Sequence, residues 1–291
     1  MNSRVSLSLP AEASGAQAPP TLARCPRQTA LQLLALRNPE DKCSQVMGFP
    51  VGDGQFDTET VFAEPTDLPG RPEQPLLVPP TQVKQRSAHT LAGRAVLVHS
   101  LAHIELNAVN LALDVIWRFP GLPATFYTDW WTVAQEEARH FGLLRQHLAS
   151  LGHQYGDFPA HQGLWEMAEK TRDDLLARLA LVPRILEARG LDMSPLIRDK
   201  LLQAGDTAGA AIMDVILRDE IGHVAIGNRW YRWVCAQRGL DSLQTFNDLA
   251  QRYRAPVQRG PFNLEARRAA GFDEAELRQL ITTPTKAGTG P

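Results

Sequence analysis

A Glu-x-x-His unit occurs twice in this 291-residue sequence, as Glu137/His140 and as Glu220/His223. Residues three positions apart on a helix lie on one face about one turn apart, so each unit presents a carboxylate beside an imidazole. A single unit of this kind is common and is usually a solvated surface pair. Here apolar residues stand at helical spacing around both glutamates, which predicts that both face a protein core.

A further glutamate precedes each unit at nearly the same distance. Glu105 stands 32 residues before Glu137, and Glu187 stands 33 residues before Glu220. Buried carboxylates are costly unless they are protonated, paired or bound to metal. Four glutamates and two histidines from four helices are the ligand set of a dinuclear carboxylate site in a bundle core. Taken alone, the EARG stretch around Glu187 fits a solvated glutamate in the last turn of a helix equally well.

The types of these side chains indicate which metals they would bind. Two metal ions about 3.5–4 Å apart require bridging anions, which carboxylates supply. Hard oxygen ligands with one imidazole for each metal favour iron or manganese, since zinc sites usually contain fewer carboxylates. We therefore predict a site for two Fe ions, with Mn or a mixed Mn/Fe pair as alternatives. The predicted metal ligands are Glu105, Glu137, His140, Glu187, Glu220 and His223.

Long segments with few prolines must position these residues. Helical periodicity predicts helices over about 84–118, 123–151, 161–189, 195–204 and 206–238. Gly190 is expected to end the third helix, which Pro183 is expected to kink, and Ser194-Pro195 is a favourable start for the short one. Because no alternating β pattern separates these segments, the predicted fold class is all-α, a four-helix bundle.

The two ends of the chain differ from this middle part. Residues 1–86 hold 12 of the 21 prolines, which excludes long helices there and predicts a wrapping arm with one short helix over 29–42. The first twenty or so residues and the end of the tail are expected to be disordered. Short helices are expected at about 241–254 and 273–282. The predicted parts are the arm (1–86), the bundle (87–240) and a C-terminal extension (241–291).

Composition argues against several classes of function. The net charge of −2 gives no reason to expect binding to nucleic acid or to an anionic membrane. Three widely separated cysteines without a CxxC pair support neither a zinc ribbon nor a disulfide framework. There is no signal-peptide core and no run of 18 or more apolar residues that would span a membrane. We expect a cytoplasmic protein that is a monomer or a small homo-oligomer.

The repeated motifs resemble those of the ferritin-like di-iron carboxylate superfamily. More closely, the chain is similar to a bacterial ferritin-like family described as a domain of unknown function. The stretches that carry the resemblance are AHIELNAV, FYTDWWTVAQEEARHF, GHQYGDFPAH, EARGLD, DEIGHVAIGNRW and PFNLEARRAAGF, between about 100 and 272. The resemblance implies the same six metal ligands. It also implies that Glu136 and Asp219 each hydrogen-bond the histidine of the other unit, although Glu136 could equally be a solvated charge.

The resemblance further implies an oxidoreductase in which two ferrous ions bind O₂ and a small-molecule substrate is oxidised or hydroxylated. The electron donor is not indicated. A tRNA-modifying hydroxylase-like enzyme and a ferroxidase or iron-handling protein are the alternatives, and a bundle with a vestigial metal site is a third. The arm and the tail around the bundle favour a covered pocket over an iron-storage cage.

Other polar and aromatic residues have simpler interpretations. His103 points away from Glu105 on a helix and is expected to be structural, whereas the roles of His153 and His161 stay open. Five arginines of the tail are interpreted as a solvated face rather than a phosphate grip: Arg252, Arg254, Arg259, Arg267 and Arg268. Three aromatic residues before Glu137 are expected to be core residues rather than electron carriers: Tyr127, Trp130 and Trp131.

Overall fold

The computed structural model describes residues 25–52, 57–83 and 86–282, so the disorder predicted for both ends falls outside the described residues. The long helices are α3 (Leu91–Arg118), α4 (Ala124–Ser150), α7 (Ala188–Gln203) and α8 (Thr207–Gln237). The shorter ones are α1 (Pro26–Leu34), α2 (Pro39–Met47), α5 (Gly163–Lys170), α6 (Leu175–Leu181), α9 (Ser242–Arg252), α10 (Leu264–Ala269) and α11 (Glu274–Thr282). The described residues contain no strand, only one isolated bridge between Leu77 and Ala160. The all-α prediction is therefore confirmed.

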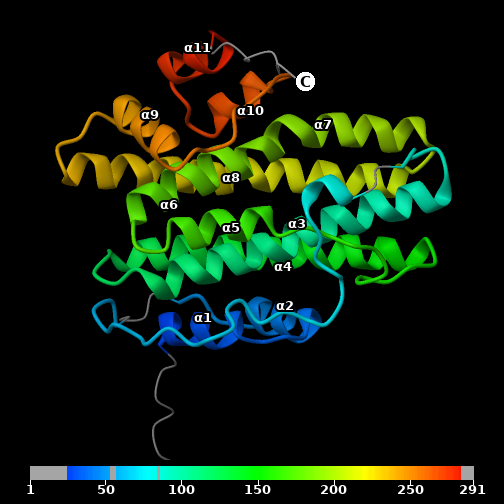
Figure 1. Cartoon of the computed structure of the whole chain (residues 1–291), viewed down its shortest axis with the longest axis horizontal. Helices are drawn as coiled ribbons and strands as arrows, with labels where there is room; N and C mark the ends of the chain where they lie inside the picture. The colour runs from blue at the N-terminus through cyan, green and yellow to red at the C-terminus, as the bar shows by residue number, and fades with distance from the viewer. Residues whose placement is uncertain (1–24, 53–56, 84–85, 283–291) are drawn as a thin grey trace, which may run out of the picture.

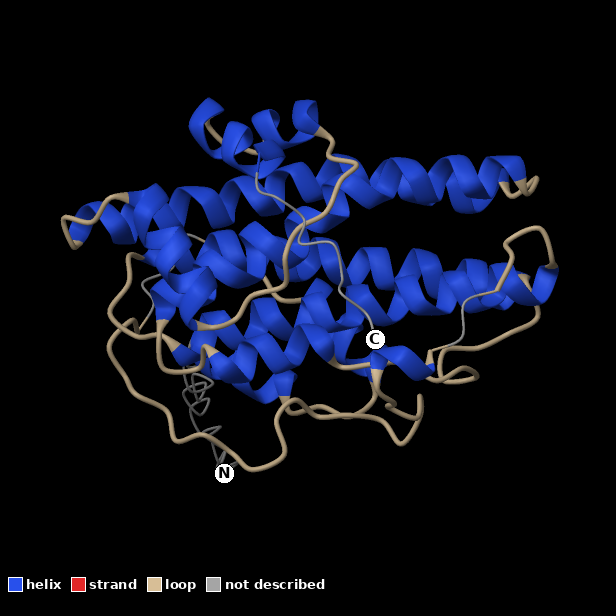
Figure 2. Ribbon diagram, turned by 45° about the horizontal axis from the view of Figure 1, so that its top comes forward, coloured by secondary structure: helices blue, strands red, loops and turns tan. Residues whose placement is uncertain are grey.

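The long helices lie side by side (Figures 1 and 2). Helix α3 packs against α4, α4 against α8, and α8 against both α7 and the segment before α7. Side-chain caps set two of the helix starts, because Thr90 accepts a hydrogen bond from the Gly93 amide and Asp206 accepts one from the Gly209 amide. Helix α3 thus begins at Leu91 rather than near residue 84 as predicted.

The predicted helix over 161–189 is wrong, and so is the separate helix over 195–204. The chain instead forms α5, α6, a π-helical turn η2 (Val182–Glu187) and a continuous α7 that contains Pro195. Proline has no N–H for the carbonyl four residues earlier, which here belongs to Leu191. The side-chain amide of Asn263 donates to that carbonyl at 3.2 Å instead. A residue far along the sequence therefore satisfies the group that would otherwise end the helix.

In its described residues the N-terminal arm contains two α-helices rather than the single predicted helix over 29–42. The Asn38 side chain accepts hydrogen bonds from the first amides of α2, and Pro39 occupies its first position, so the chain restarts there. Helix α1 packs on α3 and α2 packs on α4 (Figure 1). The buried Arg27 side chain donates to the carbonyl of Trp117 at 2.8 Å and so binds α1 to the end of α3.

The C-terminal part lies against α7 and α8 (Figure 1), and it differs from the prediction in one helix and one arginine. Helices α9 and α11 lie close to their predicted positions, whereas α10 was not predicted. Arg267 is not on a solvated face: it is fully buried and pairs with Asp192 of α7 at 2.7 Å. Because α10 packs on α7 and α8, the ion pair of Arg267 with Asp192 attaches the C-terminal part to α7. Arg268 remains at the surface beside Glu274.

Helix α3 is unusually apolar. Its most apolar 18-residue window has a mean hydropathy of 1.3. By length and composition alone the helix could cross a membrane, although it contains no continuous apolar run of 18 residues. However, 72% of the window is buried inside the protein. Core helices of soluble proteins have the same properties, so this feature is weak evidence for a membrane span.

The stability of the protein should change with pH, in part because of His99 of α3. Its ring is fully buried, and Nε2 accepts a hydrogen bond of 3.0 Å from the amide of Gly156, a bond that only neutral imidazole can accept. Burial lowers the pKa of His99 from 6.5 to about 4, although Asp157 slightly opposes this. The depressed pKa means that its stabilising effect is complete above pH 6.5 and is lost as pH falls from 6.5 towards 4.

We expect the free energy of unfolding to fall over that window by on the order of 3 kcal/mol through His99. Glutamine in its place can still accept the Gly156 bond through its side-chain oxygen but does not titrate. Urea unfolding at several pH values should therefore show a weaker acid dependence for His99→Gln. The control, His153→Gln, replaces a partly exposed histidine near the same loop and should not reproduce the change expected for His99→Gln. An unchanged profile for His99→Gln would contradict this account.

Candidate metal centre

The six predicted ligands come from separate elements that meet in the interior. Glu105 belongs to α3, the first Glu-x-x-His unit to α4 and the second to α8, and Glu187 is the last residue of η2. One ligand atom from each of Glu105, Glu137, His140 and Glu220 lies within 4.8 Å of the other three. All four residues are buried. The structure therefore assembles a compact carboxylate and imidazole cluster from residues up to 115 positions apart.

Glu137 lies at the centre of this cluster. Its Oε1 lies 3.0 Å from Nδ1 of His223, and its Oε2 lies 3.4 Å from Nδ1 of His140. The same Nδ1 of His140 lies 3.4 Å from Oε2 of Glu105, and Nδ1 of His223 lies 3.7 Å from Oε2 of Glu220. Each oxygen of Glu137 thus faces a different histidine, so this carboxylate could contribute one oxygen to each of two bound cations.

The outer nitrogens of both histidines are bonded across the two helices. His140 Nε2 donates to Asp219 at 2.9 Å, and His223 Nε2 donates to Glu136 at 2.8 Å. These are the contacts that the resemblance implied, each joining α4 to α8. A proton held on Nε2 leaves the lone pair of Nδ1 pointing into the carboxylate cluster in the neutral imidazole. The acids therefore set the tautomer that a metal-binding histidine needs.

Several buried polar atoms of the cluster have no hydrogen-bond partner among the described residues. They are both side-chain oxygens of Glu137, Oε2 of Glu187, Oε2 of Glu220, and Nδ1 of His140 and His223. Buried polar groups in native proteins nearly always have a partner. When both histidines are neutral, their Nδ1 lone pairs and the carboxylate oxygens, which are all acceptors, face the same space. Such a set fits cations, and four carboxylates would balance two divalent ions.

The pKa shifts of the histidines show how strongly the cluster attracts positive charge. Burial lowers the pKa of His140, but its contacts with Glu105 and Glu137 outweigh burial and raise the pKa to about 11. Burial likewise disfavours charged His223, yet Glu137 and Glu136 raise its pKa well above the ordinary value. In the absence of a metal, protons on these rings balance part of the carboxylate charge.

The glutamates show the complementary effect. Burial, together with the neighbouring Glu137, raises the pKa of Glu105 and of Glu220. Burial, followed by Glu220 and Glu137, raises the pKa of Glu187 to about 8. Burial also disfavours ionised Glu137, but His223 and His140 hold its pKa below the ordinary value. The cluster is thus a site where several anionic ligands are forced together, as expected of a metal centre.

A local departure from α-helical geometry positions Glu187. Pro183, the second residue of η2, cannot donate to the backbone ladder, and the chain shifts to π-helical pairing over this turn. The proline ring packs directly on Gly227 of α8, where a Cβ atom would lie only 2.4 Å from Pro183 Cβ. This close approach brings η2 against α8 and places Glu187 near Glu220. The predicted kink at Pro183 is thus present as a π-helical turn.

Comparison with known proteins places the chain in a family. Residues 35–278 match the model of a family described as "Protein of unknown function (DUF455)". The chain belongs to the DUF455 family. It is 51% identical over 213 residues to a Haemophilus influenzae protein described as uncharacterized, an alignment that covers 71% of this chain and 74% of that protein. No solved structure matches.

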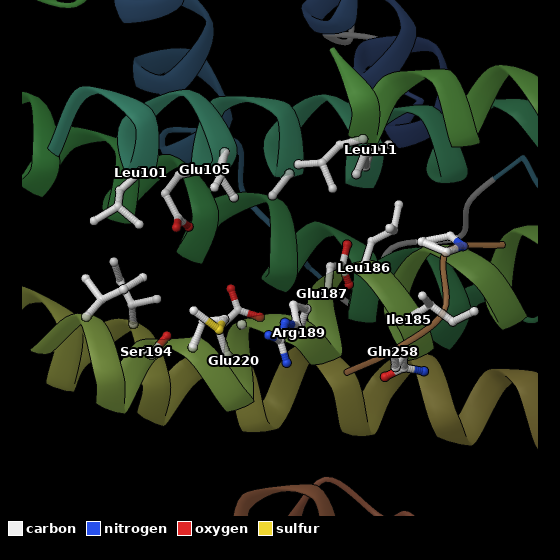
Figure 3. A pocket seen from close by; sticks show the side chains of 18 of the residues that line it. Leu101, Glu105, Leu111, Ile185, Leu186, Glu187, Arg189, Ser194, Glu220 and Gln258 are labelled. Carbon is white, nitrogen blue, oxygen red and sulfur yellow. The ribbon is translucent and has the colours of Figure 1, made fainter. Parts of the chain in front are cut away.

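A cavity of about 540 Å³ adjoins the cluster of this DUF455 protein, and its lining includes Glu105, Glu187 and Glu220. Most of its other lining residues are apolar, among them Leu101, Met213 and Ile216. Figure 3 shows the carboxylates of Glu105 and Glu220 pointing toward each other across the cavity. This cavity could not be predicted from the sequence, because its walls come from α3, α5, η2, α7, α8, His161 and residues 256–259.

Two arginines that contact Asp219 were also not predicted from the sequence. Arg139 of α4 pairs with Oδ2 of Asp219, and Arg218 donates to its Oδ1 at 2.9 Å. Burial disfavours ionised Asp219, but its hydrogen bonds with Arg218 and His140 outweigh burial and lower its pKa. Both arginines adjoin motif residues in sequence, and that adjacency is the only local signal for them.

The other histidines and aromatic residues discussed above lie in different surroundings in the DUF455 chain. His103 is buried and bonds the Tyr155 hydroxyl at 2.8 Å and the His161 carbonyl at 3.0 Å, in line with its predicted structural role. His153 pairs with Asp157 at the surface, and His161 lines the cavity. The aromatic residues before Glu137 belong to the hydrophobic core: Tyr127, Trp130 and Trp131.

Proposed function

We propose that this DUF455 protein is a dinuclear non-haem iron oxidoreductase that uses O₂ to oxidise or hydroxylate a small-molecule substrate. The observation that carries the proposal is the contact between the carboxylate cluster and the apolar cavity: three of the predicted ligands also line that cavity. An apolar pocket with a few convergent polar groups is typical of small-molecule sites. A bound metal pair would lie where such a substrate could reach it.

We also propose that the four long helical segments form a ferritin-like bundle. The side-by-side packing of α3, α4, α7 and α8 supports this arrangement. The predicted ligands also support it, because they come from α3, α4, α8 and the η2 turn directly before α7. The six ligands would be Glu105, Glu137, His140, Glu187, Glu220 and His223, and the metals two Fe ions, with Mn or a Mn/Fe pair as alternatives.

When bound, a ferrous pair supplies the electrons and the open coordination positions that reaction with O₂ requires. The residues of the chain have separate tasks. Asp219 and Glu136 orient the two histidines, and the apolar lining excludes water from the substrate. Hydroxylation of a C–H bond consumes one O₂, two electrons and two protons and releases one water. An external electron donor is therefore part of the proposal.

The proposal predicts two iron ions per chain after anaerobic loading with Fe(II), measured by elemental analysis. Exposure of the loaded protein to O₂ should then produce an absorption band of oxidised, oxygen-bridged iron, which the Glu137→Ala protein should not produce. No more than one metal per chain after careful loading would contradict the proposal. So would two bound iron ions that do not react with O₂.

Two alternatives make different predictions. An iron-storage protein would assemble into a large cage, whereas we expect a monomer or small homo-oligomer on size-exclusion chromatography. A tRNA-modifying enzyme would need cationic residues at the entrance. Arg267, one of the candidates for that role, is instead buried against Asp192, and the cavity lining is mainly apolar. Both observations favour a small-molecule substrate.

A further inference from the structure

Two cavities of this protein share one wall. The cavity beside the metal centre, of about 540 Å³, adjoins a second cavity of about 420 Å³. Both volumes fall in the range of small-molecule sites. The side chains that line both are Ile104, His161, Leu164, Met193 and Ile197. Since these side chains line both cavities, rotamer changes among them would join the two spaces into one channel.

The first cavity is elongated, with the carboxylates between its two ends. In Figure 3, Leu101 and Ser194 lie at one end, and Ile185 and Gln258 lie at the other. The end at Leu101 and Ser194 continues toward the second cavity, since the shared Met193 and Ile197 flank Ser194 in sequence. A molecule long enough to cross the shared wall would therefore pass from the second cavity to the metal centre.

The second cavity carries positive charge on the side away from Ser194, since Lys200 follows the shared Ile197 along α7 and Arg86 precedes α3. Arg86 and Lys200 both line it and both are exposed. Within the described residues neither has an ion pair with a carboxylate, so their charge is available to a ligand. In the first cavity, Arg189 lies beside Glu187 and Glu220 (Figure 3), where it donates to the Arg259 carbonyl and pairs with Asp192 at 3.4 Å. Two exposed cations, Arg86 and Lys200, line the second cavity, whereas one, Arg259, lines the opposite end of the first, so the charges of the channel favour an anionic group at Arg86 and Lys200.

We propose that the two cavities form one channel for an elongated aliphatic molecule with a single anionic head group, a carboxylate or a phosphate. The head group lies at Arg86 and Lys200, and the apolar chain extends past Ile197 toward Glu105 and Glu220. The inference rests on the proposed function only in naming the metal centre as the reactive end. Binding itself requires the channel and not the metal.

The first test is binding of octanoate, decanoate, dodecanoate and tetradecanoate to the full-length protein, measured by titration calorimetry below their micelle concentrations. Each methylene that enters the apolar channel should tighten binding about fourfold. The matching alcohols and alkyl phosphates form the other arms. Either anion should bind more tightly than the alcohol of the same length, and the preferred anion identifies the head group. Affinity that does not rise with chain length, or equal binding of anion and alcohol, would overturn the proposal.

Variants then locate the two ends. The double variant Arg86→Ala/Lys200→Ala should weaken dodecanoate about fivefold and leave dodecanol unchanged. Arg259→Ala is the matched control, because this exposed arginine lines only the opposite end of the first cavity. If Arg259→Ala weakens dodecanoate and the double variant does not, the head group lies at the other end and the proposal is wrong.

A third variant tests whether the cavities are connected. Ile104→Trp enlarges a residue of the shared wall that is 43% exposed and should therefore tolerate substitution. It should abolish the gain in affinity from octanoate to tetradecanoate, and Ile197→Trp should act in the same way. Retained length dependence in both variants would overturn the channel.

Metal content is measured separately on every sample, so the two proposals fail in distinguishable ways. Protein that binds two iron ions but no aliphatic anion refutes the channel alone. Protein that binds these anions but no metal pair refutes the proposed function alone.

Discussion

Glu137→Ala is expected to abolish binding of the metal pair. Its two oxygens face the inner nitrogens of both histidines, at 3.0 Å and 3.4 Å, so the substitution would remove the carboxylate that we propose holds both metals. No other described residue occupies that position. Elemental analysis after anaerobic loading should show at most one weakly held iron per chain, against two for the unmodified protein.

The neighbouring residue is the matched control. Glu136 bonds the outer nitrogen of His223 rather than facing the cluster centre, so Glu136→Ala should keep both metals and lower their affinity by about 10–100-fold. Asp219→Ala should behave alike through His140. A competition titration against a chelator measures both effects. If Glu136→Ala empties the site while Glu137→Ala keeps both metals, the two glutamates have been assigned the wrong way round.

Removal of metal is expected to destabilise the protein strongly. Six buried polar atoms of the cluster lack hydrogen-bond partners among the described residues, and a metal pair would provide partners for them. Binding only to the folded state adds about 4 kcal/mol when the metal is present at 1,000 times its dissociation constant. The melting temperature after chelation should therefore fall well below that of the loaded protein.

The Glu137→Ala protein provides the control for this measurement. Since this variant lacks the carboxylate at the centre of the cluster, chelation should change its melting temperature little. A chelated protein as stable as the loaded one near neutral pH would mean that the cluster is no metal site. A chelation effect of the same size in Glu137→Ala would place the stabilising metal elsewhere in the molecule.

Much of the candidate site could be predicted from sequence because its pattern is local. The spacing of Glu137 from His140 and of Glu220 from His223 specifies a shared helix face, whatever else surrounds it. Apolar neighbours at helical spacing direct that face inward. The boundaries of α4 and α8 were predicted to within one residue at each end, since Pro123, Gly152 and Gly239 mark them.

Between residues 161 and 204, by contrast, the helix-breaking residues did not mark the helix boundaries correctly, because tertiary contacts overrode them. Pro195 lies inside α7 because Asn263, 68 residues later, donates to the carbonyl that the proline cannot serve. Pro183 produces a π-helical turn because Gly227 leaves room for its ring. No local rule contains either partner, so propensity alone predicted a break at Gly190 and a new start at Ser194.

The electrostatic role of each charged residue likewise depended on what packs around it. By sequence, Arg267 and Arg268 are equivalent, yet one is buried on Asp192 and the other lies at the surface. Glu136 and Glu137 are neighbours, yet successive helix positions point about 100° apart, and only Glu137 faces the cluster centre. Periodicity determined which residues turn inward, but the cavity and the crossed hydrogen bonds arise only where separate helices meet.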